Sequence, residues 1–175
     1  MARWMIDPDH TVAAFSIRHM MITNVRGQFN AVSGTIDFDP ENVPLSKVDV
    51  TLSVAGIWTG IAKRYEHLRS PDFFDVATYP HITFTSTRVE PSGGNGFRVH
   101  GDLSIRDTTK AVTFEAEWSG PKTTDDGDTC IGFSAVTVVN REDFGITWNY
   151  PLPDGGVMVG TDVTIHLDAE ADLVS

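Results

Sequence analysis

The sequence predicts an all-β fold, either a sandwich or a closed barrel, built from antiparallel strands. The chain has 175 residues, a length typical of one domain, so we expect residues 1–175 to form a single domain. Long segments alternate apolar and polar residues with a period of two, as half-buried antiparallel strands do. Turn-forming residues separate these segments, so we expect short connections between the strands.

The alternation is clearest in segments that follow one another along the chain. In the segment 112–119, Phe114 and Trp118 lie on one face, while Glu115 and Glu117 lie on the other. We therefore expect one face of each strand toward the interior and the other toward solvent. The segments with this pattern are 13–17, 47–54, 97–106, 112–119 and 162–170.

The predicted turns are rich in Gly, Pro, Asn and Asp, the residues that turns favour. Gly27 and Gly101 lie instead inside strand-like segments, where glycine marks a bulge or a bend in a barrel wall. The turn segments are 39–42, 91–96, 107–110, 120–127 and 154–156.

One insertion has the spacing of a helix rather than that of a strand. Within 61–75, Ile61 and Leu68 fall on one helical face. We expect Ser70 to cap a second short helix that begins at 73–74. The insertion is either a simple crossover connection or a functional lid, and the two readings are compatible. Two shorter segments, 19–22 and 140–144, also interrupt the alternation.

Charge and composition exclude several classes of protein. Thirteen Lys and Arg against 24 Asp and Glu give a net charge of −11, which argues against nucleic acid as a partner. The same balance disfavours simple electrostatic docking on anionic membranes, although it leaves room for a local basic patch. The single cysteine, Cys130, excludes an intrachain disulfide, and its strand-like surroundings predict a packed thiol.

The apolar segments are too short for stable membrane insertion, since none approaches the ~20 residues of a membrane helix. The first residues lack the apolar core of a secretory signal, so we expect a cytoplasmic protein. Phosphate-loop, zinc-protease and serine-hydrolase motifs are missing from the sequence. The spacing of the six histidines does not support a metal site, and we predict neither a metal nor a cofactor.

Ordered sequence blocks resemble those of the YceI-like family nearly from end to end. The most specific block is His67-Leu68-Arg69-Ser70-x-Asp72-Phe73-Phe74-Asp75, followed by Tyr79-Pro80. The remaining blocks are Trp4-x-Ile6-Asp7-x-x-His10-Thr11-x-x-x-Phe15-Ser16-Ile17, Asn24-Val25-Arg26-Gly27-x-Phe29, Gly101-Asp102-Leu103-Ser104-Ile105-Arg106 and Asn140-Arg141-Glu142-Asp143-Phe144-Gly145.

This resemblance implies a lipocalin-like antiparallel β-barrel with a short helical insert near one mouth. It also implies a non-catalytic protein that binds or transports a long-chain isoprenoid lipid, such as a polyprenyl compound or an isoprenoid quinone. Many family members are dimeric or carry a secretory leader. The sequence departs from the family pattern at Arg64-Tyr65, at Asp107 and at Ala111, and the first change concerns recognition of the lipid head group.

We expect the apolar tail to lie among residues from the dry faces of separate strands and from the insertion. The expected tail-binding residues are Phe15, Ile17, Phe29, Ile36, Leu68, Phe73, Phe74, Phe84, Leu103, Phe114, Trp118, Phe133 and Ile165. The residues expected near a polar or phosphorylated head group are His19, Arg64, His67 and Arg69, because arginine forks suit phosphate.

Two other functions fit the sequence. A stress-related protein-interaction domain would have a filled core and no cavity. An enzyme acting on a small amphipathic substrate would bring His19, Glu66 and His67 together at the mouth. Val136 and Val138 lie on a strand face expected to be exposed, so a homodimer that pairs through this face is possible.

Overall fold

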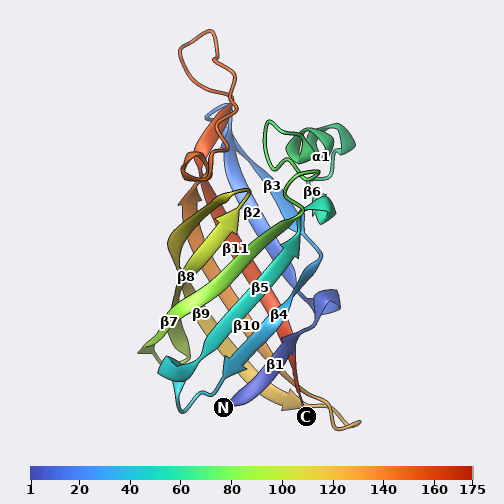
Figure 1. The fold of residues 1–175 in the computed structure, drawn as a ribbon, viewed down its shortest axis with the longest axis vertical. Helices are drawn as coiled ribbons and strands as arrows, with labels where there is room; N and C mark the ends of the chain where they lie inside the picture. Colours follow the sequence, from blue (N-terminus) through green and yellow to red (C-terminus); the bar gives the residue numbers. More distant parts are fainter. Residues whose placement is uncertain (175) are drawn as a thin grey trace.

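The computed structural model describes residues 1–174, and this part of the chain contains eleven strands and one α-helix (Figure 1). The strands are β1 (Ala2–Ile6), β2 (Val12–His19), β3 (Thr23–Phe29), β4 (Val32–Phe38), β5 (Lys47–Ser53), β6 (Ile57–Trp58), β7 (His81–Gly93), β8 (Gly96–Ile105), β9 (Thr108–Thr123), β10 (Thr129–Asn140) and β11 (Val159–Leu173). The α-helix is α1 (Ala62–Arg69), and the 3-10 helices are Pro8–His10, Val43–Leu45, Val54–Gly56 and Arg141–Phe144.

The sheet closes into an eight-stranded antiparallel barrel in the order β1-β4-β5-β7-β8-β9-β10-β11. The last strand, β11, closes it by pairing with β10 along one edge and with β1 along the other. Along this second edge β11 pairs with β2 from Val159 to Asp168 and with β1 only from Ala171 to Leu173, so β2 and β1 follow one another along it. The barrel and its short helix confirm the predicted fold class.

The period-two pattern places apolar side chains inside the barrel. Along β8, Phe97, Val99 and Leu103 are buried, whereas the intervening Arg98 and Asp102 are exposed. This alternation follows from the pleat, which turns successive side chains to opposite faces.

The insertion between β6 and β7 is less helical than its sequence predicts. Helix α1 ends at Arg69, and the second short helix predicted after Ser70 is wrong. Ser70 instead opens a turn in which its carbonyl accepts hydrogen bonds from the amides of Phe73 and Asp75. Asp75 has a φ of 48°, a left-handed conformation that reverses the chain and cannot continue a helix.

Within residues 1–174, no helix is long and apolar enough to cross a membrane.

Aromatic rings fill the end of the barrel that lies near the two chain termini (Figure 1). We call Phe38, Phe97, Trp118 and Phe133 the aromatic plug. Phe38 lies at its centre, with ring centroids 5.2 Å from Phe133, 5.3 Å from Trp118 and 5.6 Å from Phe97. The indole nitrogen of Trp4 donates a hydrogen bond to the carbonyl of Phe38. The plug therefore closes this end of the interior.

The plug makes the Phe38→Ala variant a test of how the barrel is held together. Phe38 is 1% exposed, so removing its ring leaves a cavity that we expect to destabilise the fold by about 3–5 kcal/mol. Urea denaturation followed by circular dichroism measures this change. Leu45→Ala, at an exposed position of the 3-10 helix Val43–Leu45, should change stability by less than about 0.5 kcal/mol. An equally small effect of Phe38→Ala would contradict the role of the plug.

Candidate ligand-binding cavity

The half of the barrel beyond the aromatic plug encloses a cavity of about 400 Å³. This volume lies within the range of about 300–1,000 Å³ that is typical of small-molecule sites. Apolar side chains from β2, β5, β7, β8, β9 and β11 line the wall, as in Ile17, Leu103 and Ile165. We call the end bordered by α1 and by the segment 145–158 the mouth (Figure 1).

Aromatic residues form much of the cavity wall. The rings of Phe15 and Phe29 lie 5.7 Å apart, and Phe29 meets Phe74 edge-on at the same distance. Phe84 and Phe114 form a second edge-on pair at 5.2 Å. The expected tail-binding residues that border the cavity are Phe15, Ile17, Phe29, Leu68, Phe73, Phe74, Phe84, Leu103, Phe114 and Ile165.

Three of the expected tail-binding residues lie outside the cavity lining. Trp118 and Phe133 belong to the aromatic plug, and Ile36 is buried beside Trp4 in the same half of the barrel. The sequence places all three on dry faces, but dry faces run the whole length of the barrel. Position along each strand decides whether a side chain packs against the plug or borders open space.

Glycines let aromatic rings lie close to the barrel wall. Gly27 pairs with Phe15 across β2 and β3, and a Cβ atom at Gly27 would collide with that ring. A Cβ atom at Gly101 would lie 2.5 Å from the Phe84 ring. A register shift follows Ser86, the partner of Gly101, which agrees with the bulge predicted there.

The ionisable side chains that border the described cavity are all basic, in a chain whose net charge is −11. His19, Arg64 and His67 were expected from the sequence, whereas Arg18 and Arg141 were missed. These groups gather on the mouth side, so this part of the cavity lining carries guanidinium and imidazole groups.

His67 and Arg69 are held by the insertion in different ways. His67 Nε2 lies 2.9 Å from Asp72 Oδ2, and its ring meets that of Trp148 edge-on at 4.9 Å. Arg69 lies outside the cavity lining. Its guanidinium donates to the carbonyl of Ala55 and lies over the ring of Tyr65. The partner of His67 is therefore Asp72, rather than His19 or Glu66 as the enzyme reading required.

Arg141 fixes the segment that borders the mouth. Its side chain is 4% exposed, and its guanidinium donates hydrogen bonds to four backbone carbonyls. Burial lowers the pKa of this guanidinium, although the charge of Glu142 partly offsets the effect. The break in alternation at 140–144 and the family block mark this region, but neither indicates a buried clamp. The accepting carbonyls are those of Ile146, Trp148, Val159 and Gly160.

Replacing Arg141 with Met tests this clamp. The variant removes the guanidinium donor from the carbonyls of Ile146, Trp148 and Gly160, whereas the carbonyl of Val159 keeps the side-chain amide of Asn149. We therefore expect a loss of about 3 kcal/mol or more in stability and faster proteolysis within 145–158. Urea denaturation and limited proteolysis measure the two effects. Arg98→Met, which removes an exposed ion pair with Glu115, should cost less than about 1 kcal/mol. Equal effects of the two variants would contradict the clamp.

Two clusters of potential metal ligands lie away from the cavity. In the first, Asp7, His10 and Glu170 come together at the surface. The hydrogen bond between Asp7 and His10 raises the pKa of the imidazole and lowers that of the carboxylate. In the second, Cys130 lies with Glu170 and Asp172. Hydrogen bonds join Asp7 to His10 in the first cluster and Cys130 to Asp172 in the second.

Cys130 is less acidic than an ordinary thiol. Its sulfur donates a hydrogen bond to Asp172 Oδ1 at 3.1 Å. This bond, together with burial and nearby carboxylates, raises the pKa of the thiol to about 11. At pH 8 the thiolate fraction is therefore on the order of one in a thousand, so the thiol reacts slowly.

Asp172→Asn should speed alkylation of Cys130 by iodoacetamide by at least about tenfold at pH 8, because removing the carboxylate lowers the thiol pKa. Mass spectrometry over time measures the rate. Asp128→Asn removes a weaker electrostatic contribution and should change the rate much less. If Asp172→Asn reacted no faster than the unmodified protein, the hydrogen bond would not control the thiol.

Comparison with known proteins gives consistent matches. A family model described as a YceI-like domain matches residues 4–171. A UPF0312 protein of Staphylococcus aureus is 33% identical over 171 residues, 97% of each chain. The crystal structure of BcnA from Burkholderia cenocepacia matches with a TM-score of 0.82 at 23% identity, over 94% of this chain and 98% of that chain. A polyisoprenoid binding domain from Saccharophagus degradans, implicated in plant cell wall breakdown, matches with a TM-score of 0.72 at 13% identity, over 99% and 100%. The two structural likenesses support the barrel fold.

Proposed function

The chain belongs to the YceI-like family, and on that premise we propose that it binds a long-chain isoprenoid-type lipid in the barrel cavity without transforming it chemically. The observation that carries the proposal is the apolar cavity of about 400 Å³ beside the mouth. The polyisoprenoid binding domain of S. degradans, which shares the fold, supports an isoprenoid as the ligand class. A protein-interaction domain with a filled core predicts no such cavity.

The tail would supply most of the binding energy. Burying one methylene is worth ~0.8 kcal/mol, so about twenty carbons give an upper bound near ~16 kcal/mol relative to water. Ordering the chain and the protein reduces this value. Relative to a bilayer the gain nearly vanishes, because lipid is already apolar. Such a barrel suits exchange of lipid with membranes better than irreversible extraction.

The head group would lie at the mouth, where the cavity lining becomes polar. His19, Arg64 and His67 border this part of the cavity. Arg64 Nη1 lies 3.4 Å from the carbonyl of Thr59, a long contact that leaves other donors of the guanidinium for a ligand. Arg69, engaged with Ala55 and Tyr65, would act by supporting the insertion.

A charged group placed inside the cavity tests the tail site. We expect Phe114→Glu to fold but to bind a fluorescent polyprenol analogue at least about tenfold more weakly, because the carboxyl group makes the wall polar. Equilibrium fluorescence titration measures the affinity. Leu45→Glu adds the same group in an exposed 3-10 helix, at a residue that is 64% exposed, and this variant should bind the analogue normally.

Mass spectrometry of an organic extract provides a second test, on protein purified without detergent beside an unrelated control protein. A stoichiometric polyprenyl compound or quinone would identify the natural tail. An empty extract, together with no uptake of the added analogue, would overturn the proposal. Unchanged binding by folded Phe114→Glu would overturn the assignment of the interior wall.

A further inference from the structure

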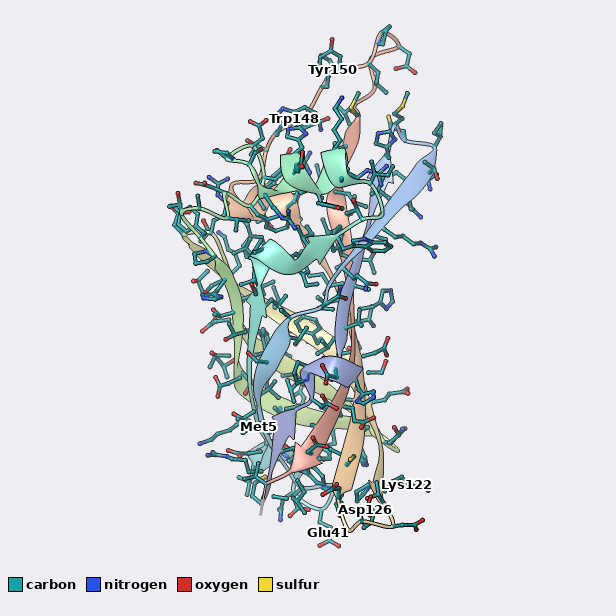
Figure 2. The ribbon with its side chains drawn as sticks, turned by 90° about the vertical axis from the view of Figure 1, so that its right-hand side faces the viewer. Met5, Glu41, Lys122, Asp126, Trp148 and Tyr150 are labelled. Carbon is teal, nitrogen blue, oxygen red and sulfur yellow. The ribbon has the colours of Figure 1, made fainter. Side chains whose placement is uncertain are left out.

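Large apolar side chains are exposed around the mouth. In the turn between β2 and β3, Met21 is 61% exposed and Ile22 is 75% exposed. Tyr150, in the segment 145–158, is 59% exposed and projects beyond the barrel (Figure 2). We use the name mouth rim for the exposed apolar residues of these two segments together with the residue just before α1. Its members are Met20, Met21, Ile22, Ile61, Tyr150 and Val157.

The mouth rim is continuous with the cavity lining. The amide of Met20 donates a hydrogen bond to the carbonyl of Met158, which joins the β2–β3 turn to the segment 145–158. Met158 and His19, the neighbours of rim residues, both border the cavity. An apolar ligand entering the cavity would therefore pass the rim.

The turn that carries the methionines is an unusual place for apolar residues. Met20 and Met21 have φ angles of 50° and 63°, in the left-handed region that favours Gly and Asn. Residues with an ordinary side chain rarely adopt this conformation, because their Cβ atom crowds the backbone. The chain thus holds two apolar side chains in solvent on a strained turn, which neither solubility nor turn stability favours.

Charge is distributed unequally along the barrel. The segments 18–26, 57–69 and 149–158 carry the rim, and they contain five Lys and Arg residues against two carboxylates, Glu66 and Asp154. At the opposite end, the segments 37–47 and 122–128 contain two Lys residues against six carboxylates. Figure 2 shows Glu41 and Asp126 at this end, far from Tyr150. The three rim segments therefore combine apolar side chains with an excess of cations, while the adjoining segments 70–75 and 140–148 add the carboxylates Asp72, Asp75, Glu142 and Asp143. The five basic residues are Arg18, Arg26, Lys63, Arg64 and Arg69.

We propose that the mouth rim docks reversibly on an anionic lipid bilayer, with the mouth facing the membrane. Apolar side chains beside cations match the boundary between acyl chains and anionic head groups. This inference rests on the proposed function, because a lipid tail passing through water would lose the favourable burial that both the bilayer and the cavity give it. Docking of the rim would let the tail move between bilayer and cavity without that exposure.

Vesicle flotation with the full chain tests the docking surface. The probes are phosphatidylcholine vesicles with and without phosphatidylglycerol. The rim variant Met21→Ser/Ile22→Ser is compared with Met5→Ser/Leu45→Ser, whose residues are 54% and 64% exposed. Met5 lies in the half of the barrel away from the mouth (Figure 2), and Leu45 belongs to the 3-10 helix between β4 and β5 at the end opposite the mouth (Figure 1). We expect the unmodified protein and the control to float with anionic vesicles, and the rim variant to partition at least about tenfold less.

Added salt and removal of phosphatidylglycerol should both weaken flotation, because cations of the rim contribute to docking. Absence of vesicle binding by the unmodified protein would overturn the proposal, as would an equal loss in the control variant. Sedimentation gives a further outcome. If the unmodified protein is a dimer, the rim variant is a monomer and neither binds vesicles, then a second copy of the chain covers the rim and the proposal is overturned.

Uptake of the fluorescent polyprenol analogue in vesicle-free solution separates this inference from the proposed function. Normal uptake by a protein that does not float would reject the docking surface alone. Loss of both would reject the lipid-binding function as well. Thermal melting of the rim variant should match that of the unmodified protein, since both substitutions lie in an exposed turn.

Discussion

Closure of the barrel by β11 is the constraint on which the rest of the structure depends. This strand pairs with β10 on one side and with β1 and then β2 on the other, so the sheet has no free edge around its closed part. Closure fixes which face of each strand is interior. It also joins the two ends of the chain, because the residues of β1 pair with those near Leu173.

The closed interior is filled unequally, and this difference separates stability from binding. Around Phe38, aromatic rings meet at centroid distances typical of favourable aromatic packing. Beyond the plug, the aromatic pairs Phe15–Phe29 and Phe84–Phe114 line the wall but leave about 400 Å³ open. A continuous apolar wall thus serves two purposes, with packing at one end and open volume at the other.

The sequence predicts the barrel wall well, because alternation and turns are local properties. The same pattern cannot separate Phe114 from Trp118, which share one face of β9 but lie in different halves of the barrel. That difference depends on strand tilt and on which rings meet across the interior. The prediction of a second helix was wrong because Asp75 adopts a left-handed φ that reverses the chain, and the pattern of apolar residues does not indicate that conformation.

Arg141 shows a different limit of sequence reasoning. An arginine in a polar segment reads as a surface residue, yet this one is buried against four carbonyls. Its hydrogen-bond partners are backbone carbonyls, so the sequence contains no acidic side chain from which the contact could be predicted. The family block places Arg141 among the ordered motifs of the sequence. Only the fold shows that this arginine holds the segment that borders the mouth.

The aromatic plug makes the interior a blind-ended compartment rather than a tunnel. Whatever occupies the cavity must leave through the opening by which it entered. If the proposed lipid occupies the cavity, the barrel would work as a shuttle rather than a conduit, because uptake and release would use the same opening. The direction of net transfer would then follow the lipid's chemical potential in the two compartments that the mouth visits in turn, with the barrel itself imposing no polarity on the traffic.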